Sequence, residues 1–95
     1  TVIGWSTHHT GIALSLLAYA LGARILEQHM TLDRAGRGTD HSYALEPQGL
    51  AKLVDDLEKG RAALGDGVKR IYLSERLPIA KMRRVQTPEG WRITR

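Results

Sequence analysis

The chain has 95 residues, 42% of them hydrophobic and 25% charged, which is typical of one small globular domain with a modest core. It contains no cysteine, so a disulfide framework and a thiolate metal site are excluded. No apolar run approaches the roughly 18 residues that a membrane span needs, and we expect a cytoplasmic protein that does not contact a membrane.

The net charge of +4 is unevenly distributed. Residues 1–68 carry a net charge of −2, whereas residues 69–95 carry eight Lys or Arg and two Asp or Glu, a net of +6. Such a basic segment can bind nucleic acid through phosphates. We favour a solvated linker or a face for another domain, because Trp91 is the only aromatic residue among the last twenty and gives no stacking platform.

The first predicted unit is a strand, a polar loop and a helix. Residues 2–5 form a short β-type run, and the loop at residues 6–10 follows it. Helical periodicity then predicts a largely buried helix over residues 11–21, with Gly22 as its C-terminal stop. Its apolar positions are Ile12, Leu14, Leu16, Leu17, Tyr19, Ala20 and Leu21.

The second predicted unit repeats this order. Residues 24–32 alternate like a strand, which places Glu27 and His29 on one face. The loop at residues 33–45 is longer than most connections, which indicates function. A helix begins near Pro47, a residue that favours the first helical turn. Its predicted buried stripe consists of Leu50, Leu53, Val54, Leu57 and Leu64.

Beyond this helix the signals are weaker. Residues 68–73 indicate a strand or an extended arm, residues 78–85 a short helix, and residues 88–90 a turn. We therefore divide the chain into one domain over residues 1–67, made of two strand–helix units, and a basic linker or tail over residues 68–95.

The β-α-β-α order predicts an α/β fold with parallel strands joined by crossover helices. Parallel strands need cover on both faces, which two strands and two helices do not supply. A complete TIM (β/α)8 barrel of such units takes about 250 residues. We therefore expect a fragment of a barrel that is completed by missing barrel segments or by homo-oligomerisation.

Polar side chains follow both predicted strands, where βα barrels carry their reactive groups. Two neighbouring parallel strands would bring His8 and His29 close together, and two neutral imidazoles with open positions can hold a divalent ion. On the residues alone, the favoured interpretation is that these are hydrogen-bonded structural histidines, because a lone histidine at a strand end is more often structural than a metal ligand. The polar residues at these strand ends and in the following loop are Ser6, His8, His9, His29, Asp40 and His41.

Three segments carry recognisable motifs. Residues 4–13, GWSTHHTGIA, are similar to the G-Y-S-x-H-x-x-G-I-A segment of the sialic acid synthase family. Residues 20–33, ALGARILEQHMTLD, resemble A-L-G-A-x-x-x-E-x-H-x-T-L-D, and residues 38–47, GTDHSYALEP, resemble G-x-D-H-x-x-S-L-E-P. The motifs occur in order with matching gaps, and the resemblance covers residues 2–76. It implies that the chain is the last quarter of the barrel, its seventh and eighth strand–helix units.

The resemblance implies a function and roles for four residues. The family condenses phosphoenolpyruvate with N-acetylmannosamine, or a related amino sugar, to a nine-carbon sialic acid and phosphate. By this resemblance His8 and His29 bind a divalent metal, Mn²⁺ with Mg²⁺ as the alternative. Ser6 would contact phosphoenolpyruvate, with the shaping of its turn as an equally weighted alternative. Asp40 would bind the sugar and act in catalysis by handling a proton. Glu27 has two interpretations that rest on its place on the face of His29: it orients a substrate hydroxyl or, as we slightly favour, it is a paired carboxylate inside the barrel.

The remaining histidines have structural interpretations. We expect His9 to face solvent and His41 to fix its loop by hydrogen bonding. The lysines that grip phosphate and the general-base glutamate of the family lie on earlier strands, so we expect no activity from this chain alone. The alternatives are a non-catalytic remnant that serves as an interaction module and a basic domain that associates with nucleic acid.

Overall fold

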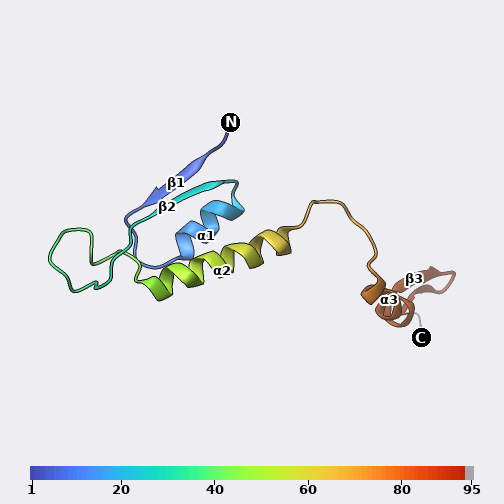
Figure 1. Cartoon of the computed structure of the whole chain (residues 1–95). Helices are drawn as coiled ribbons and strands as arrows, with labels where there is room; N and C mark the ends of the chain where they lie inside the picture. Colours follow the sequence, from blue (N-terminus) through green and yellow to red (C-terminus); the bar gives the residue numbers. More distant parts are fainter. Residues whose placement is uncertain (94–95) are drawn as a thin grey trace. The chain divides into compact units, whose positions relative to one another are not determined.

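The computed structural model describes residues 1–93 (Figure 1). The chain divides into two compact units, one from Thr1 to Gly65 and one that begins at Asp66. Each unit has secondary structure of its own. Among the described residues, no helix combines the length and the apolar character that crossing a membrane requires.

The first unit is a parallel β-α-β arrangement followed by a second helix. Its strands are β1 (Gly4–Thr7) and β2 (Ile25–Gln28), and its helices are α1 (Ala13–Ala20) and α2 (Pro47–Leu64). The strands pair in parallel, with Gly4 opposite Ile25 and Thr7 opposite Gln28. The mixed α/β class and the order of two strand–helix units are therefore confirmed, although α1 and β2 are shorter than the sequence indicated.

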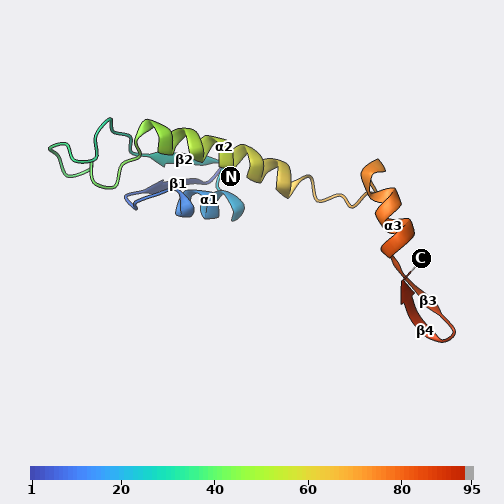
Figure 2. The same ribbon diagram turned by 90° about the horizontal axis from the view of Figure 1, so that it is seen from below.

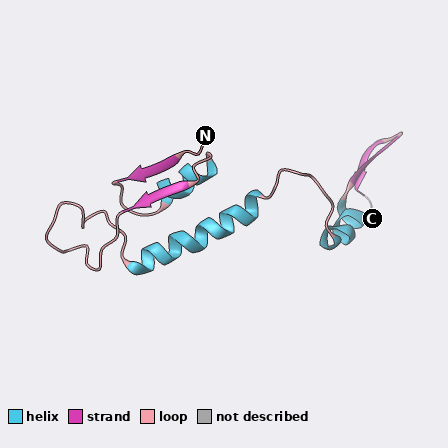
Figure 3. Cartoon of the chain, turned by 45° about the horizontal axis from the view of Figure 1, so that its top comes forward, coloured by secondary structure: helices cyan, strands magenta, loops and turns pink. Residues whose placement is uncertain are grey.

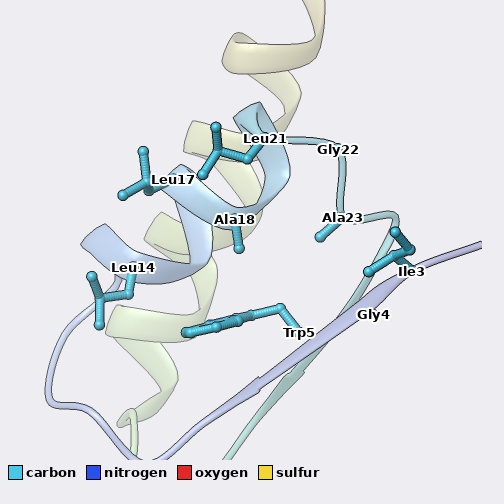
Figure 4. A pocket seen from close by; sticks show the side chains of 9 residues that line it. All are labelled: Ile3, Gly4, Trp5, Leu14, Leu17, Ala18, Leu21, Gly22 and Ala23. Carbon is cyan, nitrogen blue, oxygen red and sulfur yellow. The ribbon is translucent and has the colours of Figure 1, made fainter.

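Both helices lie on the same side of the two-stranded sheet (Figures 1 and 3). Trp5 of β1 points toward α1 (Figure 4). Because side chains alternate along a strand, its neighbour Ser6 belongs to the opposite face, the side without helices. A hydrogen bond of 3.2 Å from the Ser15 hydroxyl to Gln28 Oε1 joins α1 to β2. One face of the sheet is thus covered by helices, and the other is free to carry functional side chains.

The end of α1 explains where β2 begins. Gly22 has a φ of +117°, a conformation that favours glycine. Its N–H donates to Tyr19 O at 3.0 Å, and the N–H of Ala23 donates to Ala18 O at 2.9 Å. This Schellman-type pattern satisfies two carbonyls at the helix end and confirms the stop predicted at Gly22.

The expectation that α1 is largely buried is wrong. Leu17 and Leu21 are 54% and 82% exposed, and only Ser15 is buried within the helix. An apolar hollow of about 260 Å³ lies between α1 and β1 (Figure 4). Its lining includes Ile3, Trp5, Leu14, Leu17, Leu21 and Ala23.

The predicted buried stripe of α2 is also incomplete. Leu53 is buried, whereas Val54 and Leu64 are each more than half exposed. Both discrepancies have one physical cause: a sheet of two strands is too narrow to cover more than one side of each helix. Among the described residues the buried apolar side chains are few and include two alanines; they are Ala23, Ala44, Leu45 and Leu53.

The second unit contains a 3-10 turn, η1 (Leu73–Glu75), and a short helix, α3 (Arg76–Met82). An antiparallel hairpin follows, formed by β3 (Arg84–Thr87) and β4 (Gly90–Ile93). The chain turns at residues 88–89, as predicted, and α3 overlaps the helix expected over residues 78–85. The sequence did not predict the hairpin, because each strand is only four residues long, too short for an alternating pattern to identify it.

Candidate functional site

Ser6 and Glu27 occupy the face of the sheet that no helix covers. They are direct partners in the parallel register of β1 and β2. The Ser6 hydroxyl donates a hydrogen bond of 2.9 Å to Glu27 Oε1. The two residues predicted to contact substrate therefore form one unit, so a ligand that reaches one of them also meets the other.

His8 and His29 follow the carboxyl ends of the two strands. Because Thr7 pairs with Gln28, the residues that follow them, His8 and His29, lie beside one another. The two imidazole centroids lie 5.0 Å apart, with the rings at 84° to one another. The prediction that adjacent strand ends bring these histidines together is confirmed. The neighbouring His9 is exposed, as expected.

The loop between β2 and α2 leaves the end of β2 and returns to it before α2 begins (Figures 1 and 2). Beyond β2, Met30 and Leu45 form an isolated parallel bridge. The Leu45 N–H donates to His29 O at 2.8 Å, and the Thr31 N–H donates to Leu45 O at 2.9 Å. The end of the loop is thereby attached beside His29, which brings the rest of the loop to the two histidines.

His41 holds the interior of this loop. Its Nδ1 lies 2.7 Å from the hydroxyl of Thr31, which is buried. Its ring packs so closely on Gly36 and Gly38 that a Cβ on Gly38 would lie 2.7 Å from His41 Cδ2. The expectation that His41 fixes the loop by hydrogen bonding is confirmed.

Asp40 is the acidic group of the site. Its Oδ2 lies 3.5 Å from His29 Nε2, and its Oδ1 accepts hydrogen bonds from the Tyr43 hydroxyl and, at 3.2 Å, from the Thr39 hydroxyl. The hydrogen bond from Tyr43 is the main reason that the pKa of Asp40 is lowered from 3.8, and the nearby histidines lower it further. The same bond raises the pKa of Tyr43 to about 12. At neutral pH Asp40 is therefore an anion and Tyr43 a neutral hydrogen-bond donor.

Sequence reasoning missed Tyr43. Its ring stacks on His8 with centroids 5.0 Å apart and planes at 13°, and it lies edge-on to His29 at 5.5 Å. The residue occupies a variable position of the motif, so the motif does not identify it. Its spacing of three residues from Asp40 within one loop was the available signal.

A hollow of about 200 Å³ adjoins this cluster and is lined by His29, Met30, Asp40, His41 and Ala44. Its polar groups are two imidazoles and a carboxylate. Such a lining can accept hydrogen bonds from hydroxyl groups and can attract a cation.

The donor set limits what metal site is possible. Among residues 1–93 no group of three or more His, Cys, Asp or Glu side chains is arranged to hold a metal ion. His8 and His29 supply two imidazoles, and the anionic Asp40 stands beside one of them. These residues fit an open site in which two nitrogens bind a divalent ion and oxygen atoms from elsewhere complete its coordination.

Comparison with known proteins gives consistent matches. Residues 1–69 match the model of the NeuB family. The chain is 43% identical over 97 residues to N-acetylneuraminate-9-phosphate synthase of Homo sapiens, an alignment that covers 97% of this chain and 27% of that protein. It is also 43% identical over 82 residues to N,N'-diacetyllegionaminic acid synthase of Campylobacter jejuni, covering 86% of this chain and 25% of that protein.

A solved structure agrees with these matches. The sialic acid synthetase of Leptospira borgpetersenii, determined in complex with citrate, has a TM-score of 0.71 and 45% identity over 82% of this chain and 27% of its own. The chain thus spans about a quarter of the length of its relatives. The human alignment also extends the likeness beyond residues 2–76, where the motifs lie. This chain belongs to the NeuB family and is homologous to sialic acid synthases over most of its length.

Proposed function

We propose that this chain is the part of a condensing synthase that binds the metal and the sugar. The reaction joins phosphoenolpyruvate to N-acetylmannosamine, or to a related amino sugar, and gives a nine-carbon sugar acid and phosphate. The observation that carries the proposal is the gathering of His8, His29 and Asp40 at two parallel strand ends, within the segment that matches the family. The relatives are named for different sugar acids, so the proposal extends to the class of amino sugar only.

We further propose that β1 and β2 are the seventh and eighth strands of a (β/α)8 barrel. The parallel β-α-β unit and its likeness to part of a sialic acid synthetase support this assignment. In such a barrel the face that carries Ser6 and Glu27 points inward, and the other face packs under the helices. The preceding strand–helix unit would then cover the open edge of β1 and the apolar hollow beside α1.

His8 and His29 would hold a divalent metal, Mn²⁺ or alternatively Mg²⁺. When bound, such an ion supplies Lewis acidity that polarises the open-chain aldehyde of the sugar. Asp40, which is anionic at neutral pH, would accept a hydrogen bond from a sugar hydroxyl and handle a proton as the new bond forms. The Ser6 hydroxyl would donate to an oxygen of phosphoenolpyruvate, while Glu27 keeps Ser6 oriented or binds the sugar itself.

A hybrid enzyme tests this proposal. Residues 1–69 would replace the corresponding segment of the Leptospira borgpetersenii synthetase, and phosphate release and sugar-acid formation would be measured with and without Mn²⁺. We expect a metal-dependent synthase that loses activity in His8→Ala and in His29→Ala. His9→Ala is the matched control, because His9 is exposed beside the site, and it should retain activity. Full activity of both the His8→Ala and the His29→Ala hybrids would refute the metal assignment.

A further inference from the structure

Tyr43 contacts His8, His29 and Asp40, the three residues of the proposed metal and sugar centre. Its hydroxyl donates to Asp40 Oδ1, its ring stacks on His8, and it forms a T-shaped pair with the ring of His29. The loop carries Tyr43 and Asp40, whereas the histidines follow two different strands. Tyr43 therefore connects the loop to both strand ends through side-chain contacts.

The backbone contacts of the loop do not fix the Asp40 carboxylate. Leu45 and His41 anchor the main chain, yet the Asp40 side chain is 53% exposed and could rotate toward water. Hydrogen bonds from Tyr43 and Thr39 both reach Oδ1, which leaves Oδ2 as the oxygen directed at His29. Thr39 is exposed and adjacent in the chain, so it follows the movements of Asp40. The Tyr43 hydroxyl, by contrast, is a donor from a residue that is not adjacent to Asp40 in the chain.

The ring of Tyr43 has a second effect. A face-to-face contact with planes at 13° restricts the tilt of the His8 imidazole. His8 lies in the irregular segment after β1, where no strand pairing holds it. The aromatic contact thus supplies the support that the sheet does not give.

We propose that Tyr43 is a positioning residue of this centre: its hydroxyl orients the Asp40 carboxylate and its ring holds the His8 imidazole. The inference deepens the proposed function and rests on it, since it concerns the same site. It predicts two separable effects, because Tyr43→Phe removes only the hydroxyl and Tyr43→Leu removes the ring as well.

The first test uses nuclear magnetic resonance of the full 95-residue chain and needs no activity. In Tyr43→Leu the imidazole resonances of His8 should shift, because the stacked ring and its ring current are gone. In Tyr43→Phe the His8 resonances should stay in place, whereas those of His29 should shift as Asp40 loses its orientation. Tyr72→Phe, which changes an exposed tyrosine in the other unit, is the matched control and should leave both histidines unchanged.

The second test uses the hybrid synthase. Loss of a hydrogen bond to a charged group should lower kcat/KM for the amino sugar by about tenfold in Tyr43→Phe and further in Tyr43→Leu. The KM for phosphoenolpyruvate should change little, because Ser6 rather than Asp40 is assigned to that substrate. The expected signature is therefore a defect specific to the sugar.

The outcomes separate the two proposals. Unchanged sugar kinetics and unchanged His29 resonances in Tyr43→Phe would overturn the role of the hydroxyl. Unchanged His8 resonances in Tyr43→Leu would overturn the role of the ring. A wild-type hybrid that forms no product counts against the proposed function instead, and the resonances then decide whether Tyr43 holds His8 and Asp40.

Discussion

Replacing Asp40 with asparagine removes the charge of the loop carboxylate and keeps its size. The asparagine Oδ1 can still accept hydrogen bonds from Tyr43 and Thr39, so the contacts that shape the loop persist in a weaker, neutral form. The Asp40 side chain is about half exposed, so the change leaves no buried group unpaired and should hardly alter thermal stability. Turnover should fall about 10²–10⁴-fold, the usual contribution of a positioned acid or base.

The assay is phosphate release and sugar-acid formation by the hybrid synthase, with Mn²⁺ affinity measured separately by electron paramagnetic resonance. Mn²⁺ binding should be largely intact, because the two imidazoles remain in place. Asp55→Asn is the matched control: Asp55 is an exposed carboxylate of α2 that pairs with Lys59, and its loss should leave turnover unchanged within about twofold. Wild-type turnover in Asp40→Asn would reduce Asp40 to a residue that only structures the loop.

Further predictions concern the loop, a helix and the exposed apolar face. Ultraviolet titration should record Tyr43 ionising at about pH 12, and Asp40→Ala should return the pKa of Tyr43 toward 10.0. The contribution of this raised pKa to folding stability is fully present below pH 10.0 and is lost as the pH rises through about 12. In chemical denaturation Gly38→Ala, at a φ of +141°, should lower the free energy of unfolding by about 1–3 kcal/mol. Gly60→Ala, in open space on α2, should raise it by about 0.5–1 kcal/mol. The chain should self-associate through the exposed leucines of α1, and Leu17→Lys should favour the monomer in size-exclusion chromatography with light scattering; a wild-type monomer would contradict this.

The order of elements can be predicted from the sequence because its signals are local. Gly22 ends α1 and Pro47 begins α2, as the sequence indicated. Burial cannot be predicted in the same way, since it depends on what lies opposite each side chain. Leu17 and Leu53 both belong to apolar helical patterns, yet Leu53 is buried whereas Leu17 lines an open hollow. The sequence therefore predicts which faces are apolar but not which of them are covered.

The candidate site shows the same division. The closeness of His8 and His29 follows from two parallel strands of matching register, which the β-α-β order predicts. The place of Asp40 depends on the path of a loop without regular structure. That path is set by the hydrogen bond between Thr31 and His41, of which the sequence predicted only the histidine, and by the bridge between Leu45 and Met30, which leaves no sequence pattern. Tyr43 was missed for this reason, because its role appears only once the loop is folded.

The contacts that shape this site lie between residues 4 and 45. They are the pairing of β1 with β2, the parallel bridge at Leu45, the bond from Thr31 to His41 and the contacts of Tyr43. None of them involves the second unit or the later turns of α2. A substrate, by contrast, must be surrounded, and one face of a two-stranded sheet contacts it from one side only. The arrangement of the imidazoles and the proposed turnover of a sugar are therefore separable: the contacts behind the first all lie within this chain, while the second, under the proposed function, would require further strands. For this reason the histidine resonances of the 95-residue chain are a valid test of the site, even where that chain forms no product.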